Sequence, residues 1–137
     1  MSEKCVFCEI AHGRIPSIRV YEDADFIAFM DINPISEGHL LLVTRGHYPK
    51  TTDVPDAILD KALTLAKKLA AATLLSVGRE DFNLVVNNGP LAGQLVKHWH
   101  MHIIPRRSKD ELPLKQGAPA DLTRLPFVAE RVRENLR

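Results

Sequence analysis

The sequence predicts a single α+β domain, in which an antiparallel sheet of about five strands carries one long helix on a face and a short helix at the C-terminus. Short segments rich in β-branched and aromatic residues alternate in polarity, as half-buried strands do. One long segment spaces its apolar residues three or four apart, as an amphipathic helix does. No repeat or low-complexity linker divides the 137 residues, so residues 1–137 are expected to form one domain.

The five predicted strands are residues 19–22, 26–31, 39–44, 82–87 and 97–104. The first two flank the turn-forming sequence Asp23-Ala24-Asp25, which predicts a hairpin. Gly38 precedes the third strand, and Asn88-Gly89-Pro90 ends the fourth. Pro105 is expected to stop the fifth strand, because proline lacks the N–H group that a strand ladder needs.

The long helix is predicted between the third and fourth strands. Asp53 is a suitable N-cap, Pro55 fits the first turn, and Gly78 ends the helix. The face expected to be buried consists of Ile58, Ala62, Leu65, Ala66, Leu69, Ala72 and Leu75. Beyond Pro126, residues 127–136 predict a short last helix.

Composition and charge exclude two classes of partner. Apolar residues make up 45% and charged residues 26%, and 18 Lys and Arg stand against 17 Asp and Glu, a net charge of +1. Binding to nucleic acid through its phosphates needs a large positive excess, so we expect small anions at most and no nucleic acid. No segment approaches the roughly 18 to 20 apolar residues of a membrane span. Residues 1–5 lack the features of a signal peptide, so we expect a cytoplasmic protein.

The segment with the clearest chemistry places three histidines in alternate positions. His98, His100 and His102 are expected to share one face of the fifth strand, about 6.6 to 7 Å apart, while Trp99, Met101 and Ile103 face the helix. Neutral imidazole is a nucleophile, and the ring titrates near neutral pH. A solvated polar strand face is one alternative. A metal triad is another, although the strand supplies no carboxylate ligand.

This alternation resembles the defining motif of the histidine triad (HIT) superfamily. The flanking Gly89-Pro90-x-Ala92-Gly93-Gln94 and Pro105-Arg106 are most similar to its fragile-histidine-triad and bacterial HIT-protein branches. Further similar segments are Cys5-x-x-Cys8-Glu9-Ile10, Ile15-Pro16, Val20-Tyr21-Glu22-Asp23, Phe29-Met30-Asp31-Ile32-x-Pro34 and Gly38-His39-Leu40-Leu41-Leu42-Val43. The resemblance implies a HIT fold and covers about residues 5–107, and the C-terminal extension, residues 108–137, shows little of it.

The resemblance implies nucleotidyl transfer to water or another acceptor. The middle histidine, His100, would attack the α-phosphorus of a nucleotide and form a nucleotidyl-histidine intermediate, which water would hydrolyse. His102 is similar in position to a histidine that contacts phosphate oxygens. His39 matches a further histidine of the family, which binds phosphate or orients the nucleophile; by itself it reads equally as a surface histidine at the start of a strand.

The same resemblance implies the nucleotide contacts. Gly93 belongs to a loop whose backbone can approach phosphate closely, and Gln94 would donate an amide hydrogen bond to a phosphate oxygen. Asn87 would lie near the ribose and phosphate, and Asp31 would accept from the ribose hydroxyls. Apolar residues that could wall the base are Phe7, Ile10, Phe29 and Ile32. Many members carry Ser or Thr after the glutamine, whereas this chain has Leu95, which removes one donor and leaves the preferred substrate open.

The cysteine pair Cys5-x-x-Cys8 is by itself a weak half of a zinc site, and a redox pair or two buried cysteines are the alternatives. Tetrahedral zinc needs two more ligands, for which His47 and His98 are candidates. The resemblance to zinc-bearing HIT proteins implies the same four ligands. The zinc would be structural, because four protein ligands leave no open position for substrate.

Several functions of different classes remain open at this point. The leading expectation is a hydrolase of dinucleoside polyphosphate-type substrates, acting at the α-phosphate. An adenosine phosphoramidase of the same fold is the alternative within enzymes, and a nucleotide-binding or interaction module without turnover is the alternative to an enzyme. Small HIT proteins are homodimers, so the resemblance implies a homodimer whose interface includes the long helix and an adjoining strand, with the C-terminal segment directed toward the partner.

Overall fold

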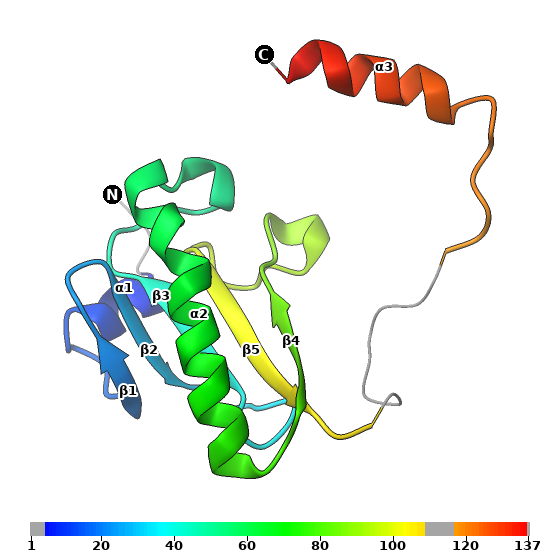
Figure 1. Ribbon diagram of the computed structural model, residues 1–137. Helices are drawn as coiled ribbons and strands as arrows, with labels where there is room; N and C mark the ends of the chain where they lie inside the picture. The colour runs from blue at the N-terminus through cyan, green and yellow to red at the C-terminus, as the bar shows by residue number, and fades with distance from the viewer. Residues whose placement is uncertain (1–4, 109–116, 137) are drawn as a thin grey trace.

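The computed structural model describes residues 5–108 and 117–136. Five strands form one antiparallel sheet in the order β1-β2-β3-β5-β4 (Figure 1). The strands are β1 Arg19–Glu22, β2 Phe26–Met30, β3 Leu40–Thr44, β4 Asp81–Val85 and β5 His100–Arg106. The helices are α1 Val6–Ala11, α2 Asp56–Val77 and α3 Leu125–Asn135, with two short 3-10 helices at Thr51–Asp53 and Pro90–Ala92. The predicted α+β class, the five strands and both predicted helices are confirmed.

The last strand in the sequence lies inside the sheet. β5 pairs with β3 on one side and with β4 on the other, so that His102 lies opposite Leu41 and Val85, and His100 lies opposite Val43. The histidine-bearing strand is therefore fixed from both sides, whereas β1 and β4 are the edges of the sheet.

The two faces of the sheet bury two separate apolar clusters. In Figure 1, α2 crosses the face toward the viewer and α1 lies behind the sheet. The cluster under α2 includes Trp99, Met101 and Ile103, as the alternation predicts. The cluster under α1 consists of Phe7, Ile10, Ala11, Ile27, Phe29, Leu41 and Val43. Since strand side chains alternate, His100 and His102 fall on the α1 side.

The boundaries of α2 differ partly from the prediction. Gly78 ends the helix in the left-handed region, at φ +67°, as predicted. Asp53 does not cap α2, which begins at Asp56. The Asp53 carboxylate instead accepts the backbone N–H of Lys50 at 3.0 Å, within the preceding 3-10 turn.

The buried stripe of α2 also ends earlier than predicted. Its buried residues are Ala62, Leu65, Ala66, Leu69 and Ala70. Ala72 and Leu75 are exposed. At 3.6 residues per turn, the buried side of the helix continues through residues 73 and 77 instead.

The fifth strand is shifted toward the C-terminus relative to the predicted residues 97–104. It begins at His100, so His98 lies just before it, and it passes through Pro105 to Arg106. Pairing with β3 ends at Ile103, so Pro105 lies where β5 has a neighbour on one side only. A proline is tolerated there, because no N–H is required on the open side.

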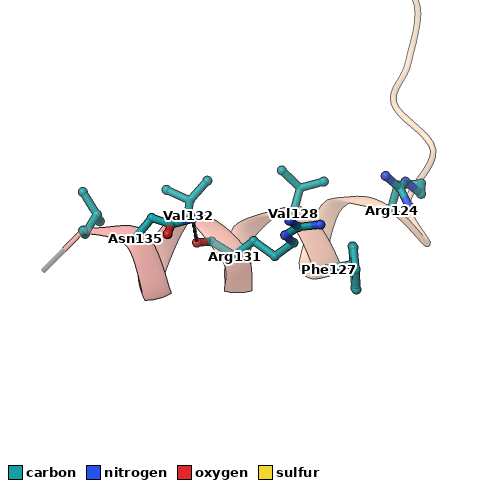
Figure 2. Close-up of a pocket in the computed structure, with 7 residues that line it drawn as sticks. Arg124, Phe127, Val128, Arg131, Val132 and Asn135 are labelled. Carbon is teal, nitrogen blue, oxygen red and sulfur yellow. Dashed lines mark hydrogen bonds between the residues drawn. The ribbon is translucent and has the colours of Figure 1, made fainter. Parts of the chain in front are cut away.

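The C-terminal helix α3 begins two residues before its predicted start and has no buried residue. Figure 1 draws it apart from the sheet and α2. In Figure 2, Val128 and Val132 project to one side of α3, and the guanidinium carbon of Arg124 lies 5.3 Å from the centre of the Phe127 ring. Residues 109–116 of the predicted extension lie outside the described part of the chain. Within that part, no helix is both long and apolar enough to cross a membrane.

Candidate active site and metal site

The three alternating histidines line the α1 face of the sheet and are largely buried. His98 is 0% exposed and His100 is 6% exposed, so this is not a solvated polar strand face. The ring centres of His100 and His102 are 5.0 Å apart. Phe7 of α1 lies edge-on to His100, with ring centres 4.9 Å apart. The triad therefore lies under α1, on the opposite face of the sheet from α2.

Hydrogen bonds fix the tautomer of His98. Its Nε2 lies 2.6 Å from the backbone oxygen of Thr44, and a carbonyl oxygen only accepts, so Nε2 carries the proton. The lone pair of a neutral His98 is then on Nδ1. That atom lies 3.3 Å from Sγ of Cys5, 3.4 Å from Sγ of Cys8 and 3.2 Å from Nδ1 of His47.

Cys5, Cys8, His47 and His98 form a tetrad of possible metal ligands. One ligand atom from each lies within 4.8 Å of all the others. The two sulfurs lie on the same side because Cys5 caps α1 and accepts the backbone N–H of Cys8 at 3.4 Å. The sequence therefore predicted a set of four residues that the fold does bring together.

The chemistry of the tetrad fits a zinc ion. Burial and the neighbouring Cys5 thiol raise the pKa of Cys8 to about 11, so ionising this sulfur requires a cation close by. Two thiolates and two neutral imidazoles are a usual tetrahedral zinc set. The first triad histidine, His98, is thus a member of this tetrad, and the other two are not. Among the described residues, the three triad histidines do not form a metal-ligating group of their own, contrary to the metal-triad alternative.

The ring of His100 is held through one of its two nitrogens. Its Nδ1 lies 2.7 Å from the backbone oxygen of His98 and must donate to it, which leaves the lone pair on Nε2. Burial lowers the pKa of His100, so the ring is neutral at neutral pH. A neutral imidazole whose second nitrogen is held in place is the form needed for attack on an electrophile.

His102 is oriented by a second histidine. The backbone N–H of Ile35 donates to Nδ1 of His39 at 3.0 Å, so the proton of neutral His39 is on Nε2. That nitrogen lies 2.9 Å from Nδ1 of His102 and donates to it, which places the His102 proton on Nε2. Burial and the neighbouring histidines lower the pKa of His102 to about 4. His102 is therefore a neutral ring with an N–H to donate.

Asp31 joins this pair of histidines. One of its carboxylate oxygens lies 3.5 Å from Nε2 of His39, and the other accepts the backbone N–H of Asn33 at 2.8 Å. Asp31, His39 and His102 form a second group whose ligand atoms lie within 4.8 Å of one another. The resemblance implied that His39 binds phosphate or orients His100, whereas in the structure its hydrogen bond goes to His102.

The glycine-containing loop is held by Gln94. The side chain is 6% exposed; its Oε1 accepts the backbone N–H of Gly89 at 2.8 Å, and its Nε2 donates to the backbone oxygen of Pro49 at 2.6 Å. The backbone N–H groups of Ala92, Gly93 and Gln94 also donate within the loop. One Nε2 hydrogen of Gln94 remains available beyond the Pro49 contact. The partners at Pro49 and Thr44 carry no sequence signal, because any residue supplies a backbone carbonyl.

The other predicted nucleotide contacts differ in accessibility. Asn87 follows β4, and its amide nitrogen is 3.9 Å from the position that a Cβ of Gly93 would take. Phe7, Ile10 and Phe29, which the sequence suggests as walls for the base, are buried in the cluster under α1. Ile32, the fourth such residue, is exposed. Leu95 is 94% exposed, beside the buried Gln94.

Two of the known proteins that the chain matches illustrate the activities named among its relatives. The chain is 38% identical over 140 residues to an adenosine 5'-monophosphoramidase of Candida albicans, covering 96% of this chain and 91% of that protein. It is 37% identical over 110 residues to an adenylylsulfatase of Arabidopsis thaliana, covering 80% of this chain but 56% of that protein. The chain thus spans little more than half of the plant protein.

Solved structures agree over nearly the whole chain. A HIT family protein from Bacillus subtilis superposes with a TM-score of 0.90 at 32% identity, covering 98% of this chain and 99% of that one. A zinc-bound histidine triad family protein from Mycobacterium smegmatis superposes with a TM-score of 0.74 at 31% identity, covering 97% of each chain. The family model described as the HIT domain matches residues 12–109. The chain therefore belongs to the HIT domain family.

Proposed function

We propose that this chain is a nucleotide hydrolase in which His100 takes up the nucleotidyl group. The observation that carries the proposal is the 2.7 Å contact between Nδ1 of His100 and the backbone oxygen of His98, which leaves the Nε2 lone pair for the substrate. The matching HIT family model and the names of the two relatives support this reaction class.

The reaction proceeds in two displacements at the α-phosphorus. Nε2 of His100 forms a bond to phosphorus while the bond to the leaving group breaks; the Nε2–H of His102 donates a hydrogen bond to a phosphate oxygen, and the leaving oxygen or nitrogen takes a proton from water. A second water then attacks the nucleotidyl-histidine, its proton neutralises the hydroxide left by the first step, and the nucleoside monophosphate leaves with His100 restored. Dividing one difficult displacement into two easier steps is the benefit of the covalent intermediate.

The nucleotide is held by groups on both sides of β5. Asp31 accepts from the ribose hydroxyls, and Asn87 lies near the ribose and phosphate. The remaining Nε2 hydrogen of Gln94 binds a phosphate oxygen, together with His100 and His102, and Gly93 has no side chain to keep the phosphate away from the loop. The position of Asp31 directly after β2, beside His39, supports this role.

Two substrate classes follow from different observations. The sequence pattern around Pro90 and Pro105 favours dinucleoside polyphosphates. The relative named as an adenosine 5'-monophosphoramidase favours a phosphoramidate, in which the leaving group is an amine. The exposed Leu95 offers no hydroxyl to a further phosphate oxygen, which also favours the second class.

A structural zinc ion and a second copy of the chain complete the proposal. Cys5, Cys8, His47 and His98 would hold one zinc per chain, which supplies a fixed anchor for the N-terminal segment, and thiolate ligands suit a cytoplasmic location. Elemental analysis that finds no zinc, with both cysteines freely alkylated, would contradict this. A homodimer would form through α2 and β4, where Leu63, Leu74, Phe82 and Leu84 line an apolar groove.

Turnover of two substrates by two proteins tests the function. We expect purified protein to release AMP from either diadenosine polyphosphates or an adenosine phosphoramidate, and His100→Ala to abolish this. Quenching with alkaline detergent during turnover should trap a nucleotidyl group on wild-type protein only, because a P–N bond to histidine survives in alkali and is lost in acid. AMP binding without turnover in both proteins would identify a binding module instead, and turnover that survives in the variant would place the nucleophile elsewhere.

A further inference from the structure

Helix α1 connects the metal tetrad with the nucleophile. It has six residues, from Val6 to Ala11, and a helix this short is not stable in water by itself. Its position depends on tertiary contacts. The Cys5 and Cys8 sulfurs hold its start, Phe7 and Ile10 are buried against the sheet, and Arg19 and Arg45 donate to the backbone oxygens of Ile10 and Ala11 at its end, so the metal tetrad bears on the start of the helix. The residues that touch the tetrad and those that touch the active site are thus neighbours on one turn of helix.

Phe7 is the residue of α1 that reaches the nucleophile. It is 7% exposed, and its ring meets three others edge to face. The ring centres are 4.9 Å from His100 at an interplanar angle of 84°, 6.0 Å from His98 at 78°, and 5.7 Å from Phe29 at 73°. The hydrogen bond at Nδ1 fixes the His100 ring at one point only. The Phe7 ring beside it limits how far the His100 ring can turn.

His98 makes a second connection between the two sites. Its ring presents Nδ1 to the cysteines, while its backbone oxygen accepts the Nδ1 proton of His100 at 2.7 Å. A ligand that fixes the His98 ring and the two sulfurs therefore fixes two of the groups that hold His100: the backbone oxygen of His98 and the phenyl ring of Phe7.

We propose that Phe7 is a positioning residue that couples metal binding at the tetrad to nucleotide binding at His100. The proposal rests on the function proposed above. With the tetrad filled, α1 is held and His100 is presented to the phosphate; with the tetrad empty, α1 is released and the nucleotide binds more weakly. Because binding free energies are reciprocal, nucleotide must strengthen metal binding by the same factor.

The test measures affinity for Zn²⁺ by competition with a chromophoric chelator, with and without saturating AMP. We expect AMP to tighten Zn²⁺ binding about fivefold or more, and Zn²⁺ to tighten AMP binding by the same factor. The histidine side-chain ¹⁵N–¹H spectrum should show a protonated Nδ1 on His100 in the zinc-loaded protein, and exchange between tautomers in the metal-free protein.

Two variants on the same helix locate the connection. Phe7→Leu removes the aromatic ring. In this variant we expect the ratio of the Zn²⁺ affinity with AMP to the Zn²⁺ affinity without AMP to fall toward one. Ile10→Val is the matched control, since Ile10 is also 7% exposed in the same cluster and has no ring contact with His100, and it should keep the ratio. A lost base contact would weaken AMP binding with and without metal alike and would not change this ratio.

The outcomes separate this inference from the proposed function. If wild-type protein binds AMP and Zn²⁺ but neither affects the other, the coupling is wrong while the proposed function stands. The proposed role of Phe7 would also be overturned if Phe7→Leu kept the same ratio of Zn²⁺ affinities as Ile10→Val. Failure of the zinc-loaded protein to bind AMP would overturn both proposals. If circular dichroism shows that Phe7→Leu is unfolded, the coupling is tested on wild-type protein alone, by its Zn²⁺ and AMP affinities and by the histidine ¹⁵N–¹H spectrum.

Discussion

The Nε2 atom of His39 lies 2.9 Å from Nδ1 of His102, although the two residues are 63 positions apart in the chain. The backbone N–H of Ile35 occupies the other nitrogen of His39, so the direction of the hydrogen bond between the rings is fixed. The proton on the far side of His102 is therefore set by a residue just before β3, and not by anything on β5 itself.

Replacing His39 should slow turnover without loss of the fold. We expect His39→Ala to reduce kcat by about 10- to 100-fold, because His102 would no longer be held as the Nε2–H tautomer. Steady-state kinetics on the better of the two nucleotide substrates measures this. His12→Ala is the control, since His12 is exposed and its ring hydrogen-bonds to the backbone oxygen of Cys8 in α1. Wild-type kcat in His39→Ala would contradict the assigned orienting role.

Stability should fall as the pH is lowered from 6.5 to about 4. Burial and neighbouring histidines lower the pKa of His102 to about 4, whereas His102 in the unfolded chain titrates near the ordinary 6.5. Between these values the unfolded state binds more protons, so the free energy of unfolding rises with pH, by at most about 1.4 kcal/mol per pH unit for this group.

Urea unfolding at pH 5 and pH 7 measures the contribution of His102. His102→Gln cannot titrate, so it should show a smaller loss of stability between these two pH values than wild-type protein does. The difference between the two proteins reports His102 together with its interactions with His39 and His100, which lie against it. An identical loss in the two proteins would show that His102 titrates normally in the folded state.

Gln94 should matter for stability as well as for phosphate binding. Gln94→Ala leaves the N–H of Gly89 and the backbone oxygen of Pro49 without their partner, which costs about 1 to 3 kcal/mol of the free energy of unfolding. Gln94→Glu keeps an acceptor for Gly89 but cannot donate to Pro49, so it should not rescue stability. Urea titration measures both variants.

The neighbouring residue is a matched control for Gln94. Leu95 is almost wholly exposed, so Leu95→Ala should change the free energy of unfolding by no more than about 0.5 kcal/mol. Equal stability of Gln94→Ala and Leu95→Ala would mean that the two hydrogen bonds of Gln94 do not brace the loop.

The groove between α2 and β4 should hold the second copy. Leu63 lines this groove and is 63% exposed, so Leu63→Asp places a charge in the proposed interface without disturbing the core. We expect wild-type protein to be a dimer and Leu63→Asp to dissociate at least tenfold more readily, measured by light scattering across a concentration series. Leu75→Asp, on the same helix but outside the groove, should remain dimeric. Dimers of equal strength in all three proteins would place the interface elsewhere.

The sequence predicts most of the fold because its signals are local. Alternation marks the strands, and Gly78 ends α2 where a positive φ is needed. The predicted boundaries were wrong where a tertiary contact overrode a local sequence preference. Pro105 continues β5 because one side of the strand is open there, and Asp53 caps an earlier turn because Lys50 is within reach. Neither circumstance can be seen in a sequence window.

The candidate site divides in the same way. Three alternating histidines and a Cys-x-x-Cys pair are properties of the chain, and they determined by themselves which residues we propose to carry the chemistry. Only the tertiary structure decided which nitrogen of each ring holds its proton, because that depends on the group that each nitrogen meets. The oxygens of Thr44 and His98 and the N–H of Ile35 make that choice. Every residue has these backbone groups, so only the folding that brings particular ones against each ring can assign the roles.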